Sequence, residues 1–77
     1  MDKIKVDSTN INSIGFDKET LTLEVEFKNK TIYQYTVVPE ELYRNLMIQP
    51  SKGSYFSKYI KNYFKYKKLN TWKIKNF

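Results

Sequence analysis

The chain contains neither cysteine nor histidine among its 77 residues. Without cysteine it can form neither disulfides nor a thiolate metal site, so a single small hydrophobic core has to stabilise it. Without histidine it also lacks the commonest general base and a frequent metal ligand. These absences predict a non-enzymatic domain with no cofactor and no metal. The lack of cysteine also fits a reducing, cytoplasmic setting.

Long apolar runs are missing as well. No stretch approaches the roughly 20 apolar residues of a membrane span, so we expect no membrane association. The first eight residues alternate in charge without an apolar segment, and we do not expect a signal peptide. The length predicts one domain spanning residues 1–77. Its core would cover roughly residues 6–66, and residues 67–77 would form a basic tail or a short extra element.

Acidic residues are missing from the last third of the chain. Residues 1–51 contain six basic and eight acidic side chains, whereas residues 52–77 contain eight lysines and no acid. The first part therefore carries a net charge of −2 and the second +8, which together give the +6 of the whole chain. The second part also contains eight of the 13 aromatic residues. Lysines interleaved with aromatics suit a ligand that offers both phosphates and bases.

Three stretches in the first half of the chain predict β-strands, at residues 11–16, 21–28 and 31–38. The second is the clearest, because apolar and polar residues alternate in it without exception. Short turns separate the three stretches, so they predict a three-stranded antiparallel β-meander. Glu24 and Glu26 share one face of the second strand, and we interpret them as a solvated edge of the sheet rather than a catalytic pair.

The loop between the second and third strands determines where Tyr33 and Tyr35 lie, because a one-residue slip reverses the face of every side chain. A two-residue loop would place both tyrosines beside glutamates. A three-residue loop, residues 28–30, would place them beside apolar residues of the second strand, together with Val37. We favour the longer loop, because it separates apolar from polar side chains and requires only Lys30 to be left-handed. Both tyrosines are then expected in the core with their hydroxyls at its rim, and the alternative is that they form a stacking platform for bases on the sheet.

Two helices should follow the strands and pack on one face of the sheet, which makes the fold α+β with an irregular C-terminal tail. The first begins at Pro39, which suits the first helical position, and ends before Pro50. The second is predicted over residues 51–68, with Ser51 or Ser54 as its cap. At 100° per residue, two opposite faces emerge. They carry Phe56, Tyr59, Ile60 and Tyr63 on the apolar side, and Lys58, Lys61, Lys65 and Lys68 on the basic side.

The order of several motifs resembles that of the KTSC domain over roughly residues 6–64. The motifs are Ser8-Thr9-x-Ile11-x-x-Ile14-Gly15-Phe16-Asp17, Tyr33-x-Tyr35, Val38-Pro39-x-x-x-Tyr43-x-x-Leu46 and Ser51-x-Gly53-x-Tyr55-Phe56-x-x-x-Ile60. The KTSC domain is named for the C-terminus of some lysyl-tRNA synthetases and also stands alone in bacteria and phages. The resemblance implies an RNA-binding role through that attachment. Two positions depart from the family: Lys30 replaces a usual glycine, and Ser57 a frequent asparagine.

We therefore predict a small non-enzymatic domain that binds RNA or single-stranded nucleic acid through its second helix. The alternative is a protein-interaction module with an acidic protein partner, and in either case we expect a monomer rather than an oligomer. The segment from Ser51 to Ser54 could also hold a phosphate, although helix capping alone explains it. The candidate contacts are Lys58, Lys61, Lys65 and Lys68 for phosphates, and Tyr55, Tyr66 and Trp72 for stacking on bases.

Overall fold

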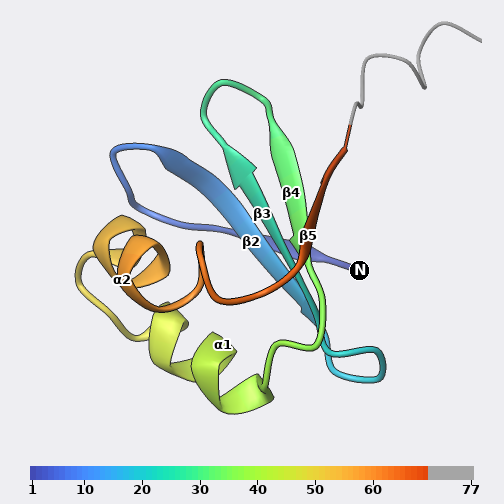
Figure 1. The fold of residues 1–77 in the computed structure, drawn as a ribbon. Helices are drawn as coiled ribbons and strands as arrows, with labels where there is room; N and C mark the ends of the chain where they lie inside the picture. Colours follow the sequence, from blue (N-terminus) through green and yellow to red (C-terminus); the bar gives the residue numbers. More distant parts are fainter. Residues whose placement is uncertain (70–77) are drawn as a thin grey trace, which may run out of the picture.

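The computed structural model describes residues 1–69 (Figure 1). Within them the chain forms an antiparallel sheet of five strands, in the order β1-β2-β3-β4-β5, and two helices between β4 and β5. The elements are β1 Lys3–Lys5, β2 Ile11–Asp17, β3 Thr22–Phe27, β4 Ile32–Tyr35, α1 Glu40–Met47, α2 Lys52–Tyr59 and β5 Tyr66–Leu69. The α+β class is confirmed, but the prediction of three strands is wrong, because β1 and β5 extend the meander at both edges.

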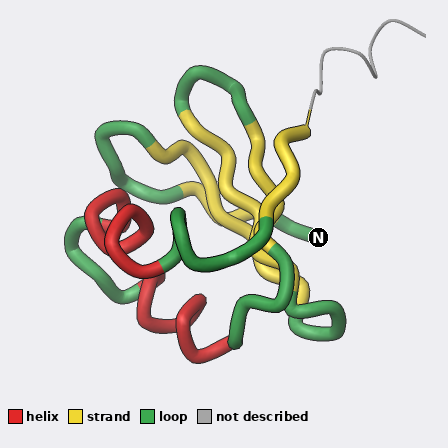
Figure 2. Tube along the Cα trace, viewed as in Figure 1, coloured by secondary structure: helices red, strands yellow, loops and turns green. Residues whose placement is uncertain are grey.

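Both helices lie on the same side of the sheet (Figure 2). The core between the two layers is built from the alternating residues of β2 and β3, the end of β4 and one face of each helix. Its buried members are Ile11, Ile14, Leu23, Val25, Tyr35, Val38, Leu46, Phe56 and Ile60. Neither of the helices within residues 1–69 is long and apolar enough to cross a bilayer.

The hairpin between β3 and β4 has the three-residue loop that the sequence favours. Val25 pairs with Tyr33, and the register continues so that Tyr35 also lies on the core side. The Phe27 N–H donates to the Thr31 carbonyl at 2.9 Å, and the third loop residue, Lys30, is left-handed with φ 71°. The polar and apolar faces of the hairpin therefore separate as predicted.

The chain leaves the sheet after Tyr35, earlier than the predicted strand end. Val37 adopts a left-handed φ of 58° and is 69% exposed, so its expected place beside the apolar residues of the second predicted strand is wrong. Val38 occupies the core instead, and its N–H donates to the Leu21 carbonyl at 2.9 Å. This reversal turns the chain towards α1, for which Pro39 is the N-cap rather than the first helical residue.

The helix α2 begins as expected and ends early. Ser51 is its N-cap, and its hydroxyl accepts a hydrogen bond from the Ser54 N–H at 3.4 Å. After Tyr59 the helix closes, because the N–H groups of Ile60 and Lys61 both donate to the Phe56 carbonyl, at 3.0 and 2.9 Å. The predicted helix over residues 51–68 is therefore too long.

The early end of α2 changes the faces that a continuous helix would have had. Phe56 and Ile60 are buried as predicted, whereas Tyr59 is 45% exposed and Tyr63 is 71% exposed. Because Lys61, Lys65 and Lys68 lie beyond the helix, the predicted basic stripe along one helix face does not exist.

The segment that follows α2 returns to the sheet as β5. Tyr66 pairs with Tyr35 and Lys68 pairs with Tyr33, so β5 satisfies the backbone groups at the outer edge of β4. Three of the six residues between α2 and β5, at positions 60–65, are isoleucine, tyrosine or phenylalanine, and these types favour extended over helical backbone. The strand covers residues 67–69 of the segment predicted as a basic tail or a short extra element, and residues 70–77 lie outside the part of the chain described.

On the sheet face away from the helices, a lysine of β1 pairs with the two glutamates of β3. The Lys3 amine lies 3.2 Å from a carboxylate oxygen of Glu24 and 3.9 Å from one of Glu26. The Gln34 amide also donates to Glu24 at 2.8 Å, and the Ser13 hydroxyl donates to Glu26 at 2.9 Å. The glutamates therefore belong to a polar cluster on the central strand β3, not to a solvated edge.

Candidate nucleic-acid interface

Five aromatic side chains contact one another in a closed circuit where α2 meets β3, β4 and β5. In order of contact they are Phe27, Tyr33, Tyr66, Tyr35 and Phe56. The centroids of neighbouring rings are 5.3–5.7 Å apart. Aromatic pairs at such distances contribute about 0.5–1.5 kcal/mol each beyond their burial. The circuit therefore holds four elements in fixed relative positions.

A groove with a volume of about 530 Å³ opens beside this circuit. Phe27 and Tyr33 are both partly exposed there, while Tyr35 and Phe56 are buried behind them. We call it the aromatic groove, and the lining residues that matter below are Phe27, Lys28, Tyr33, Ser57, Lys61 and Lys68. It combines an apolar floor with three primary amines.

The lysines that line the aromatic groove come from three separate elements. Lys28 lies in the β3–β4 loop, Lys61 in the turn after α2, and Lys68 on β5. Lys68 is the cross-strand partner of Tyr33, so both side chains project from the helix side of the sheet. Within residues 1–69 the ion pairs use Lys3 and Arg44, and none of the groove lysines contacts a carboxylate. Their charges are therefore available to an anionic ligand.

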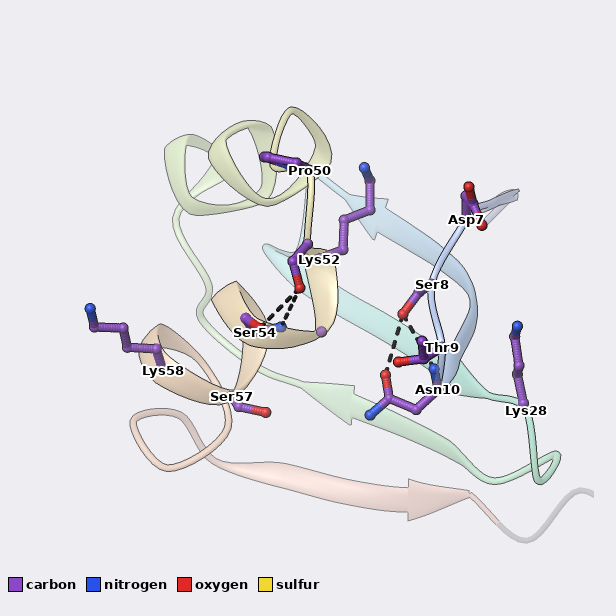
Figure 3. Close-up of a pocket in the computed structure, with 12 residues that line it drawn as sticks. Asp7, Ser8, Thr9, Asn10, Lys28, Pro50, Lys52, Ser54, Ser57 and Lys58 are labelled. Carbon is purple, nitrogen blue, oxygen red and sulfur yellow. Dashed lines mark hydrogen bonds between the residues drawn. The ribbon is translucent and has the colours of Figure 1, made fainter.

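A second hollow of about 860 Å³ lies between the β1–β2 connection and the start of α2 (Figure 3). We call it the polar recess, and its lining includes the carboxylate of Asp7 and the polar residues Ser8, Thr9, Asn10, Lys52, Ser54 and Ser57. The two sides approach closely, because a Cβ on Gly53 would lie 2.8 Å from the Asn10 side-chain oxygen. Glycine at this position therefore allows α2 to sit against the connection.

The start of α2 is capped from within the chain. The Ser54 N–H donates to the Ser51 hydroxyl, and the Tyr55 N–H donates to the Ser51 carbonyl at 3.2 Å. The Lys52 amine donates to the Gln49 carbonyl at 2.9 Å. The predicted cap at Ser51 is therefore present, and these contacts stabilise the start of α2.

The structure brings together only some of the residues predicted to contact a ligand. Lys61 and Lys68 line the aromatic groove, whereas Lys65 lines neither hollow. Lys58 borders the polar recess, but its side chain extends away from it (Figure 3), and its amine lies 5.4 Å from the centroid of the Tyr59 ring.

The predicted stacking residues divide in the same way. Tyr66 belongs to the aromatic circuit, whereas Tyr55 contacts Tyr59 on α2, with ring centroids 4.7 Å apart. Trp72 lies outside the described residues. Phe27 was not predicted as a groove residue, and for Tyr33 a place in the core was favoured over a stacking surface. The predicted hairpin register correctly placed Tyr33 on the helix side of the sheet. Its position near the edge of the sheet is the signal that could have identified it as a groove residue.

Burial in the aromatic circuit affects the ionisation of Tyr35. Loss of solvent raises the pKa of this phenol to about 12, and the neighbouring hydroxyls of Tyr33 and Tyr66 add to the shift. Tyr35 is therefore neutral at any physiological pH, and its ring acts as part of the groove's rear wall.

Comparison with known proteins places the chain in a family. The profile of the KTSC domain matches residues 7–64. A crystal structure of a KTSC domain protein from Yersinia pestis superimposes with a TM-score of 0.86 at 38% identity, covering 88% of this chain and 96% of that one. An uncharacterized protein from Stutzerimonas stutzeri is 34% identical over 61 residues, 79% of this chain and 86% of its own length.

Two further relatives are much longer proteins. Lysine–tRNA ligases from Nostoc punctiforme and from Nostoc sp. are 34% and 39% identical over 67 residues. In each case the match covers 87% of this chain and 12% of the ligase, so the chain corresponds to a small part of those enzymes. The matched motifs, the superimposed fold and the similar lengths of the other two relatives agree. The chain belongs to the KTSC domain family.

Proposed function

We propose that this domain binds RNA without catalysing a reaction, and that the aromatic groove is its binding surface. The convergence of Lys28, Lys61 and Lys68 around the partly exposed rings of Phe27 and Tyr33 carries this proposal. Amines neutralise phosphates, and aromatic rings stack on bases, so the groove offers both types of contact that a nucleic acid uses. The net charge of +6 adds long-range attraction.

The ligase relatives make tRNA a natural first ligand to test. Their name states that they act on tRNA, and this chain matches a segment of only 12% of their length. A segment of that size with a basic groove is suited to contacting RNA, while the ligase reaction is not transferred to it. A domain that binds RNA without catalysing a reaction needs no catalytic residues.

Titration of labelled tRNA and of a short single-stranded RNA tests the proposal. If the three groove lysines neutralise about three phosphates, affinity should fall roughly twenty-fold between about 50 and 200 mM salt. Absence of binding at the lower salt concentration, or affinity that does not change with salt, would contradict the proposal.

An acidic protein would be attracted by the same lysines, so the titration needs a competitor that has charge but no bases. Polyglutamate at matched charge should compete weakly with RNA, because it cannot stack on the rings. If polyglutamate binds as well as RNA and depends on the same lysines, an acidic protein partner replaces RNA as the ligand.

A further inference from the structure

We propose that the RNA is single-stranded and that one unpaired base enters the aromatic groove, against Phe27 and Tyr33. This inference rests on the proposed function and specifies the strand state of its ligand. In a duplex, each base is stacked on its neighbours and only its edges are accessible. An unpaired base can present its flat face to an aromatic side chain, as single strands do on other protein surfaces.

The size and rigidity of the groove suit one inserted base. Its volume of about 530 Å³ lies within the range of about 300–1,000 Å³ that small-molecule clefts occupy. The Tyr33 ring contacts Phe27, Tyr35 and Tyr66, and the Phe27 ring also contacts Phe56. Because neighbouring rings fix them, the two floor residues lose little freedom when a base binds.

Lysines from three separate elements line the groove and are available to the phosphates that flank such a base. Lys61 lies beyond the end of α2, whereas Lys68 and Lys28 belong to β5 and the β3–β4 loop. A base placed on the rings would have backbone phosphates on both sides, and the proposal assigns these phosphates to the groove lysines. Point charges on flexible stems tolerate variation in the phosphate path, which suits binding without a strict sequence preference.

The polar recess provides a continuation for the strand. It adjoins the aromatic groove, because Thr9, Asn10, Lys28 and Ser57 line both hollows. The exposed side chains of Asn10 and Ser57 offer an amide and a hydroxyl at this junction. The strand therefore leaves the aromatic groove over Asn10 and Ser57 rather than over the exposed face of α2 that carries Tyr59.

Binding of a short oligouridine, compared with a blunt RNA duplex of the same length, tests this inference. The single strand should bind at least roughly tenfold more tightly, because the duplex keeps its bases stacked. Tyr33→Leu keeps an apolar side chain but removes the ring, and it should weaken oligouridine binding roughly tenfold. Tyr59→Leu is the matched control on α2, and it should leave the affinity unchanged.

A crosslinking measurement on the unaltered protein tests the inference even if Tyr33→Leu fails to fold. Oligouridine that carries a photoreactive thiouridine is irradiated in the complex, and the modified peptide is identified by mass spectrometry. Modification of Phe27, Tyr33 or Tyr66 supports the inference, and modification confined to Tyr55 and Tyr59 overturns it. Equal affinity for duplex and single strand also overturns it while leaving the proposed function intact. Failure to bind any RNA overturns both.

Discussion

The ring of Tyr66 lies edge-on against the ring of Tyr33, with centroids 5.4 Å apart and ring planes at 83°. This contact joins β5, which follows both helices in the chain, to β4, which precedes them. It also places Lys68 beside Tyr33, because the two residues are cross-strand partners. The strand β5 therefore completes the sheet and supplies one side of the aromatic groove at the same time.

The left-handed loop residue Lys30 provides a test of the hairpin. Replacing it with glycine, Lys30→Gly, should raise the free energy of unfolding by about 0.5–1 kcal/mol, because glycine adopts a φ of 71° without steric cost. Chemical denaturation measures the change. The matched control Lys28→Gly, at a loop position with negative φ, should instead lower stability by a similar amount. Destabilisation by both replacements would contradict the loop conformation.

Val37 is a β-branched residue in the left-handed region, with φ 58°, and this conformation is costly for such a side chain. Val37→Asn should stabilise the domain by about 1 kcal/mol, because asparagine tolerates the left-handed region and little burial is lost at an exposed site. Val37→Thr keeps the branching and should have little effect. Thermal unfolding of the two variants distinguishes these outcomes, and equal stability for both would refute the assigned strain.

The raised pKa of Tyr35 predicts a loss of stability in alkaline solution. The unfolded chain should ionise at the ordinary pKa of 10.0 and the folded chain only near pH 12, so the stabilising contribution is complete below about pH 10. This contribution is lost as the pH rises from about 10 towards 12, and the loss of stability amounts to about 2 kcal/mol at about pH 11.5.

The variant Tyr35→Phe isolates this effect, because it keeps the ring and removes the ionisable hydroxyl. Urea unfolding at about pH 9 and about pH 11.5 should show a fall in stability that is about 2 kcal/mol smaller for Tyr35→Phe than for the unaltered chain. Equal falls in the two proteins would mean that Tyr35 ionises as freely in the folded state as in the unfolded one.

Much of the central fold could be predicted from the sequence because its signals are local. The uninterrupted alternation from Leu21 to Lys28 identifies β3, and the chemistry of the three-residue loop determines the register with Tyr33 and Tyr35. The cap at Ser51 is likewise a local feature. In each case the residues that contact one another are close in sequence, or are related by one tight turn.

The two outer strands could not be predicted in this way. The strand β1 has only three residues and a single apolar side chain, so it has no periodicity to detect. The residues that precede β5 have a regular spacing of three and four up to Tyr63, and this spacing equally predicts a helix that continues into β5. Pairing with the open edge of β4 decides the competition, and that edge is created by distant residues.

The candidate site was predictable in composition but not in geometry. Lys61, Lys68 and Tyr66 stood out because basic and aromatic residues accumulate near the C-terminus. Lys28 and Phe27 belong to the groove only because the β3–β4 hairpin lies beside β5. The prediction of a helix over the residues of β5 did not allow this arrangement. The same interpretation grouped Lys65 with the site, although the structure places it outside the groove.

A comparison of two double variants with equal loss of charge tests the central claim most directly. Lys61→Gln/Lys68→Gln removes two groove amines, whereas Lys65→Gln/Lys67→Gln removes two nearby ones that do not line the groove. Lys67 pairs with Gln34 and projects from the opposite face of the sheet.

The affinity of both double variants for a short single-stranded RNA is measured across a range of salt concentrations. The groove variant should bind roughly tenfold more weakly at low salt, and the magnitude of its logarithmic salt slope should fall by about 1.4, the value for two lost phosphate contacts. The control should remain close to the unaltered domain. Equal losses in the two variants would show that net charge, not the aromatic groove, attracts the RNA, and would contradict the account.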